Sequence, residues 1–178
     1  PRSRAMEPHM SDTTSAPPQE GQQQVPPLVV NIQYVKDLSF EVPGAPEVFS
    51  TLRTQPHVNI NLDVQARRIT DGQEVFEVTI AIKAEATETQ GGNGAANGRP
   101  VFIVELAYSG IFTLSGIPQE AVEPVLLVEC PRLLFPYARN ILADVTRDGG
   151  FPPVLLQPID FVALWQSRRQ GQGQPANA

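Results

Sequence analysis

Two neighbouring segments that alternate apolar and polar residues constrain the fold of this chain more than any other feature of its sequence. Every second residue in them is apolar: Val58, Ile60, Leu62, Val64 and Ala66 in the first, and Phe76, Val78, Ile80, Ile82 and Ala84 in the second. A period of two residues is that of a strand with one buried face. The Asp71-Gly72 pair between the runs is typical of a hairpin turn. The sequence therefore predicts an antiparallel hairpin.

Two further segments show the same period and predict two more strands. In residues 29–42 the apolar side chains share one face: Ile32, Tyr34, Leu38, Phe40 and Val42. Lys36 interrupts that face, which indicates an edge or a bulge. In residues 101–113 the apolar face is Phe102, Val104, Leu106 and Tyr108, and Gly110 predicts a shift of register. The connection 43–56, with three prolines, is predicted to be a long loop.

The period changes from two to about 3.6 residues after Pro118, which predicts helices. Residues 119–129 form a short helical segment interrupted by Pro124, and a main helix runs from Arg132 to Asp148, ended by Gly149-Gly150. Its predicted core stripe is Leu134, Ala138, Ile141 and Val145. Asp160 is predicted to cap a last helix, from Phe161 to about Arg169. Strands followed by helices indicate an α+β fold: a four-stranded antiparallel sheet with a helical layer packed on one face.

The chain divides into one folded domain and two tails. Residues 1–28 are predicted to be a vector remnant, ending before Met10, followed by a disordered N-terminal tail rich in Ser, Thr, Pro and Gln. Residues 29–169 form the domain, interrupted by a flexible Gly-rich insert at 90–98. Residues 170–178 are predicted to be a disordered C-terminal tail.

Composition argues against several classes of function. The 178 residues carry a formal net charge of −6, which disfavours nucleic acid and anionic membranes as partners. Cys130 is the only cysteine and His57 the only histidine after Met10, so neither a metal site nor a nucleophile with its base is predicted. No run of about 18 apolar residues and no secretory leader is present, which favours a cytoplasmic protein. We expect no enzyme activity and no cofactor.

Two surfaces of the predicted fold are not explained by folding alone. The outward face of the sheet carries Asp37, Glu41, Glu77, Glu85 and Glu105, with Ile103 among them. It is either an ordinary solvated face or a docking surface for a basic partner. The helices carry apolar residues off the core stripe, among them Leu133, Phe135, Tyr137 and Leu142. These indicate contact with another copy, a binding groove, or a generous core.

Three segments closely resemble the SecB family of protein-export chaperones. They are VKDLSFEVPGAP (35–46), GIF (110–112) and CPRLLFPYAR…GGFPPVLLQPIDF (130–161), and the resemblance extends over about residues 31–165. It implies the fold predicted above, with a crossover loop between the first two strands. It also implies a homotetramer, arranged as a dimer of dimers with the main helices between the dimers. Such proteins bind unfolded precursor proteins in the cytoplasm without using ATP and deliver them to SecA, the motor of the Sec translocon.

The resemblance also implies site residues. Asp37, Glu41, Ile103 and Glu105 match positions that the family offers to SecA. The groove for unfolded precursors is expected to include Phe40, Phe49, Leu155, Phe161, Leu164 and Trp165. The tetramer interface is expected to include Leu133, Leu134, Tyr137, Ile141 and Val145.

Two other functions remain open at this point. The same groove could carry a small apolar ligand in the cytoplasm, or the chain could be a SecB-like chaperone dedicated to one partner such as an antitoxin.

Overall fold

The computed structural model describes residues 26–88 and 98–172. Strands β1 (Leu28–Glu41), β2 (His57–Arg68), β3 (Val75–Thr87) and β4 (Pro100–Leu114) form one antiparallel sheet in the order β1-β4-β3-β2. The short helix α1 (Val48–Thr51) lies in the connection that crosses from the β1 edge to the β2 edge. This confirms the predicted sheet and its crossover loop.

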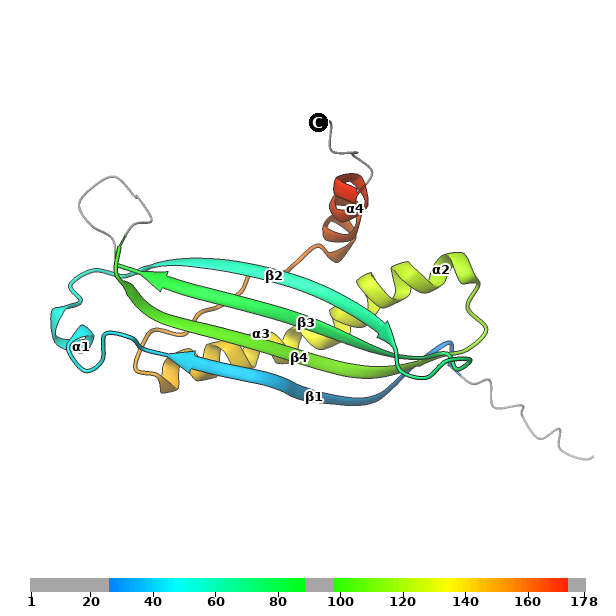
Figure 1. Ribbon diagram of the computed structural model, residues 1–178, viewed down its shortest axis with the longest axis horizontal. Coiled ribbons are helices and arrows are strands. Elements are labelled where there is room, and N and C mark those ends of the chain that lie inside the picture. The colour runs from blue at the N-terminus through cyan, green and yellow to red at the C-terminus, as the bar shows by residue number, and fades with distance from the viewer. Residues whose placement is uncertain (1–25, 89–97, 173–178) are drawn as a thin grey trace, which may run out of the picture.

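The helices follow the sheet along the chain. They are α2 (Gln119–Pro124), the π-helix η1 (Val125–Glu129), α3 (Cys130–Asp148) and α4 (Phe161–Gln172). Figure 1 shows α3 lying across one face of the sheet, with α4 projecting beyond the β2 side. The π-helix ends two residues before Pro131, which has no amide hydrogen to bond the carbonyl four residues earlier. A wider helical turn is one way to accommodate such a loss. The predicted α+β architecture is thus confirmed.

The predicted boundaries shift by a few residues. β1 begins at Leu28, within the predicted tail, and α3 begins at Cys130 rather than Arg132. Helix α4 continues to Gln172, past the predicted end at Arg169. The disorder predicted for residues 1–25 and 173–178, and for most of the 90–98 insert, lies outside the described residues. Among the described helices, none has the length and apolar character needed to cross a membrane.

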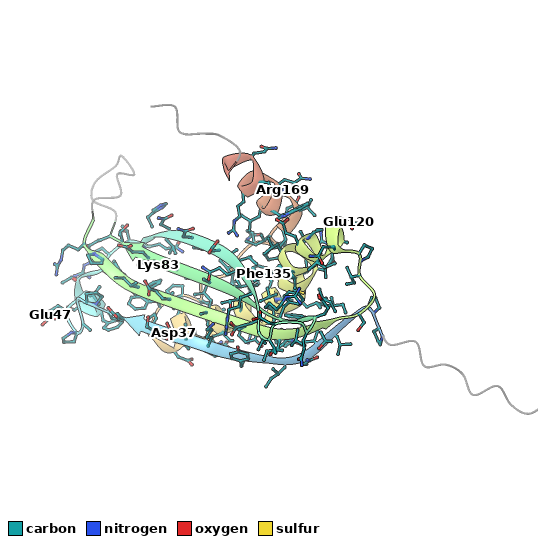
Figure 2. All side chains as sticks on the ribbon, turned by 45° about the vertical axis from the view of Figure 1, so that its right-hand side comes forward. Asp37, Glu47, Lys83, Glu120, Phe135 and Arg169 are labelled. Atoms are coloured by element: carbon teal, nitrogen blue, oxygen red, sulfur yellow. The ribbon has the colours of Figure 1, made fainter. Side chains whose placement is uncertain are left out.

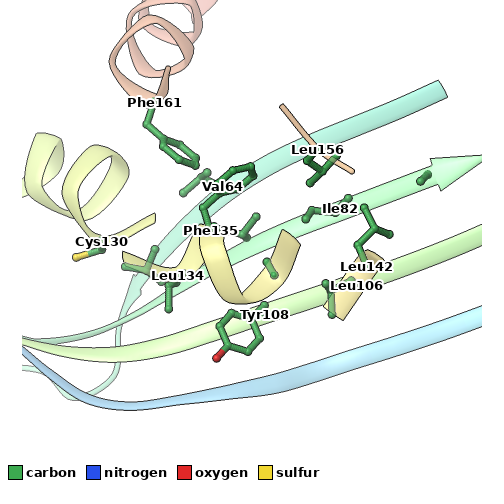
Figure 3. Packing of buried hydrophobic residues seen from close by; sticks show 14 of the residues in the cluster. Val64, Ile82, Leu106, Tyr108, Cys130, Leu134, Phe135, Leu142, Leu156 and Phe161 are labelled. Carbon is green, nitrogen blue, oxygen red and sulfur yellow. The ribbon is translucent and has the colours of Figure 1, made fainter. Parts of the chain in front are cut away.

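The core lies between α3 and the sheet (Figure 3). Five fully buried α3 side chains lie four residues apart, at Cys130, Leu134, Ala138, Leu142 and Thr146. The predicted stripe was therefore partly wrong, because Ile141 and Val145 are only half-buried and Leu142 belongs to the core. Gly110 of β4 allows the close approach of α3, since a Cβ there would lie 2.9 Å from Leu134 Cδ2.

Two irregularities in β1 change which side chains share a face. The register with β4 shifts between Val30 and Ile32 and again between Val35 and Asp37. A one-residue shift moves every following side chain to the other face. Ile32 and Tyr34 therefore lie on the face away from α3, whereas Phe40 faces α3. The prediction that all of them share one face was wrong, although the predicted bulge at Lys36 is confirmed.

Candidate functional site

The sheet face opposite α3, hereafter the outer face, gathers exposed carboxylates over all four strands. Residues directly opposite each other on neighbouring antiparallel strands share a face. One row across the sheet holds Glu41, Ile103, Glu85 and Asn59; the next holds Ser39, Glu105, Lys83 and Asn61; the third holds Asp37, Ala107, Ala81 and Asp63. The four residues predicted for this face, Asp37, Glu41, Ile103 and Glu105, thus lie together within neighbouring rows.

A hollow of about 270 Å³ lies in this part of the outer face. Its floor includes Ala81 and Ala107, whose short side chains leave space between the longer neighbours. Around it stand Asp37, Asn61, Asp63, Lys83 and Glu105. Figure 2 shows Asp37 and Lys83 on different strands of this sheet. Sequence reasoning placed Asp63 and Lys83 outward but did not nominate them, although the strand alternation contained that signal.

Lys83 is a cation that lies among these carboxylates. Its Nζ donates a hydrogen bond of 2.7 Å to Glu105 Oε1. That hydrogen bond and the charge of Glu105 raise the pKa of Lys83, with smaller contributions from Glu85 and Glu41. Lys83 is therefore an internal counter-ion at the centre of an acidic surface.

Glu77, which was predicted to be solvent-exposed on the same face, is in fact buried. Tyr34 Oη donates to Glu77 Oε1, and Lys36 and Arg67 both contact Oε2, at 3.0 and 2.5 Å. Burial alone would raise the pKa of Glu77, but the hydrogen bonds from Tyr34, Arg67 and Lys36 outweigh it and lower the pKa to about 2. Glu77 is therefore a structural anion whose charge is already neutralised, and it adds little to the acidic surface.

An aromatic cluster lies where the crossover loop meets the end of α3. The Phe40 and Phe102 rings are stacked with their centroids 5.8 Å apart, and the Phe151 ring lies tilted at 4.9 Å from Phe102 and 5.3 Å from Phe49. Phe49 keeps 54% of its surface exposed. Beside the cluster, a pocket of about 230 Å³ separates β2 from the segment 152–155. Its apolar lining includes Pro56, Val58, Ile60, Phe102 and Leu155.

A larger groove of about 730 Å³ lies between the other end of β2, the α2–η1 segment and α4. Its lining combines apolar and polar groups: Val64, Ala66, Val122, Leu126, Leu127, Trp165, Arg168 and Arg169. Trp165 Nε1 donates to Glu123 Oε1 at 3.1 Å across it. Figure 2 shows Arg169 on α4 standing away from the sheet.

The six predicted groove residues therefore do not form one continuous set. Phe40 and Phe49 lie in the aromatic cluster, with Leu155 in the neighbouring pocket, whereas Trp165 lies in the groove beside α4. Leu164 is half-buried and does not line that groove. Phe161 is 1% exposed, edge-on to Phe135 at 5.8 Å, so its side chain is unavailable to a ligand. Its nomination was wrong for that reason; it anchors α4 in the core.

Part of the α3 surface facing away from the sheet is apolar. Leu133 and Tyr137 are 42% and 54% exposed, and Ile141 and Val145 are half-buried. Leu134 is wholly buried within the same chain, so its side chain has no surface to offer an interface, and that nomination was wrong. The sequence analysis missed a second apolar surface along β1, formed by exposed Val30, Val35 and Leu38 on the α3 side of the sheet.

The side chains suited to chemistry are not arranged for it. Cys130 is fully buried, and burial, with the nearby charge of Glu129, raises the pKa of its thiol to about 12. No group of three or more His, Cys, Asp or Glu residues that could hold a metal ion occurs within residues 26–88 and 98–172. The arrangement is suited to binding other molecules through apolar and acidic surfaces.

In comparisons with known proteins, a family model and two similar relatives are all described as SecB. The family model described as preprotein translocase subunit SecB matches residues 21–172. A protein-export protein SecB from Granulibacter bethesdensis is 66% identical over 163 residues, which cover 92% of each chain. The corresponding protein of Gluconacetobacter diazotrophicus is 59% identical over 172 residues, 95% of this chain and the whole of that one.

A solved structure shares the fold. The SecB-like chaperone of Mycobacterium tuberculosis, in complex with a peptide from an antitoxin, superposes with a TM-score of 0.58. The match covers 75% of this chain and 91% of that one at 13% sequence identity.

Proposed function

The chain belongs to the SecB family of cytoplasmic, non-enzymatic protein-export chaperones, which bind unfolded precursor proteins, and from this premise we propose how its surfaces divide the work. The apolar pockets along β2 hold unfolded precursors, the outer face docks SecA, and the exposed face of α3 joins the chain into a homotetramer. Each of these three roles is thus proposed for a different surface of the protomer.

The observation that carries the proposal is the exposure of apolar and aromatic groups beside defined hollows. Phe49 and Leu155 are 54% and 58% exposed, and each belongs to, or lies next to, an apolar pocket at one end of β2. The groove beside Trp165 lies at the other end. The two hollows contact β2 residues from Val58 to Ala66, about 26 Å apart along an extended strand. An unfolded precursor in an extended conformation has the length and apolar side chains to reach both.

Binding of this kind suits many sequences, because neither hollow selects a single shape. Each contact is weak, but repetition of the pockets around a tetramer raises the overall affinity for a long chain by roughly 10²–10⁴ through effective concentration. No ATP is needed to hold the precursor. Its release then depends on transfer to an acceptor.

SecA is that acceptor, and it docks on the outer face. Asp37, Glu41 and Glu105 supply negative charge around Ile103 and the neighbouring hollow. An acidic surface with apolar patches complements a basic partner, and such complementarity mainly raises the association rate and the specificity. Docking there leaves the pockets on the other face of the sheet free to hold the precursor.

The tetramer, arranged as a dimer of dimers, requires two interfaces on each protomer. Two exposed apolar surfaces are available. One is the outward face of α3, with Leu133, Tyr137, Ile141 and Val145. The other is the exposed row Val30, Val35 and Leu38 of the edge strand β1. Large apolar patches on a lone protomer favour burial against copies of the chain.

The test compares two variants with opposite expected defects. Glu105→Lys should weaken SecA binding, and make it less dependent on salt, while a slowly folding precursor is still held unfolded. The double variant Leu155→Ser and Trp165→Ser should hold the precursor poorly while SecA binding is retained. SecA binding is measured by sedimentation, and holding by the rate at which the precursor folds. Equal loss of both activities in both variants would contradict separate surfaces.

A further inference from the structure

Arg168 of α4 reaches around the free edge of the sheet. β2 is an edge strand, and Arg168 lies on the α3 side of it. Its Nη1 donates to the backbone carbonyl of Val64 at 2.8 Å, and its Nη2 pairs with Asp63 Oδ1. The other oxygen of that carboxylate, Oδ2, accepts a hydrogen bond of 3.0 Å from Gln65. One residue of α4 is thus tied to a side chain of the outer face.

Asp63 also borders the hollow in the outer face. It shares a row with Ala81, Ala107 and Asp37, and it lines the hollow together with Lys83 and Glu105. Since a carboxylate offers about four acceptor positions, Asp63 can receive a further cation from the hollow. Such a cation competes with Arg168 for the same charge and repels its guanidinium.

The other contacts of α4 hold its first turn more firmly than its later turns. The first turn is fixed by buried Phe161 and by Asp160, whose Oδ1 accepts hydrogen bonds from the amides of Val162 and Ala163 at 3.0 Å. Farther along, Leu164 and Trp165 pack against the core, and the hydrogen bonds found there to the rest of the described chain are those from Trp165 to Glu123 and from Arg168 to Asp63 and Val64. Trp165 and Arg168 also line the groove beside β2. Loss of the Arg168 contact therefore loosens the groove side of α4.

We propose that the Asp63–Arg168 ion pair couples the two faces of the sheet: a cationic side chain of SecA that enters the outer hollow draws Asp63 away from Arg168, and the end of α4 that borders the groove is released. This inference rests on the proposed docking of SecA at the outer face. The link is suited to exchange, because the Arg168 and Asp63 side chains are 30% and 47% exposed. Ion pairs of that exposure contribute little stability, so one incoming charge is enough to replace them.

Amide hydrogen exchange of α4 in the intact protein, read by mass spectrometry, tests the coupling. In the unmodified protein, saturating SecA should speed exchange of the α4 amides by roughly two- to fivefold, the range expected for loss of one exposed ion pair. In Asp63→Asn and in Arg168→Met, exchange should already be faster without SecA, and SecA should add little. Glu85→Gln is the control: it removes an outer-face charge that does not contact α4, so SecA at saturation should still speed exchange.

SecA binding is measured by sedimentation of the same samples, so two kinds of failure can be told apart. If SecA sediments with the protein but α4 exchange is unchanged or slower, the coupling is wrong and the docking proposal stands. The coupling is also wrong if Asp63→Asn responds to SecA as the unmodified protein does. If SecA binds none of the variants nor the unmodified protein, the docking proposal fails and the coupling fails with it.

Discussion

Replacing Glu77 by Gln should destabilise the protein strongly at neutral pH and much less in acid. Glu77 is 3% exposed, and its carboxylate accepts hydrogen bonds from Tyr34, Lys36 and Arg67. These lower its pKa from an ordinary value near 4.5 to about 2. A difference of that size corresponds to about 3 kcal/mol of stability at pH 7. Because Lys36 and Arg67 are themselves 43% and 65% exposed, solvent screening reduces the expected loss to about 2 kcal/mol.

The sign of the pH dependence follows from the direction of the shift. A carboxylate whose pKa is lower in the folded protein stabilises it above the unfolded-state pKa, here near 4.5. That stabilisation is lost as the pH falls from about 4.5 towards 2. The difference in the free energy of unfolding between the unmodified protein and Glu77→Gln should therefore shrink by more than half between pH 7 and pH 3.

Urea unfolding followed by circular dichroism, at one protein concentration and several pH values, measures this difference. Glu74→Gln is the matched control, since Glu74 is 49% exposed and pairs only with Arg68 among the ion pairs of the described residues. It should cost no more than about 0.5 kcal/mol at any pH. A Glu77→Gln effect equal to that of Glu74→Gln, or one that is the same at pH 7 and pH 3, would refute the reasoning.

Three more perturbations have expected outcomes. Lys83→Met removes a positive charge that pairs with Glu105 on the outer face, so SecA should bind up to about fivefold more tightly at low salt in binding titrations, and the gain in affinity should be smaller at high salt. Weaker binding of SecA would contradict the role of Lys83 as a counter-ion. Tyr137→Asp places a charge on the exposed face of α3 and should yield smaller particles in sedimentation velocity; an unchanged particle would exclude this face from the assembly. Gly149→Ala places a Cβ 2.2 Å from the Phe40 ring and should lower the free energy of unfolding by roughly 1–3 kcal/mol in urea titrations. The control Gly44→Ala, whose Cβ would lie 3.5 Å from its nearest neighbour, should cost far less, and equal effects of the two substitutions would contradict close packing at Phe40.

Much of the fold could be predicted because the period of apolar residues within each short segment indicates its secondary structure. The alternation around Asp71-Gly72 defined the hairpin, and the acidic positions on the outer face followed from the same period. In β1 the same reasoning went wrong at Ile32 and Tyr34, because a bulge changes the face of every residue beyond it and leaves no certain mark in the sequence.

What could not be predicted depends on contacts between distant parts of the chain. Glu77 alternates like a solvent-exposed residue, and its burial depends on Tyr34 and Lys36, more than forty residues away in the sequence. Phe161 resembled a groove residue because the helix it begins borders a groove, yet its ring is packed on Phe135. Arg168 and Asp63 are 105 residues apart in the sequence, and no local pattern predicts that they pair.

The most direct test of the whole account is a native mass spectrum of the purified protein mixed with an unfolded precursor kept reduced. If four chains together hold the precursor, the spectrum should show ions of four chains that carry it. The double variant Leu155→Ser and Trp165→Ser should lose the precursor but keep the four-chain ion. A single chain that carries a small molecule, or four-chain ions that never retain the precursor, would contradict the account.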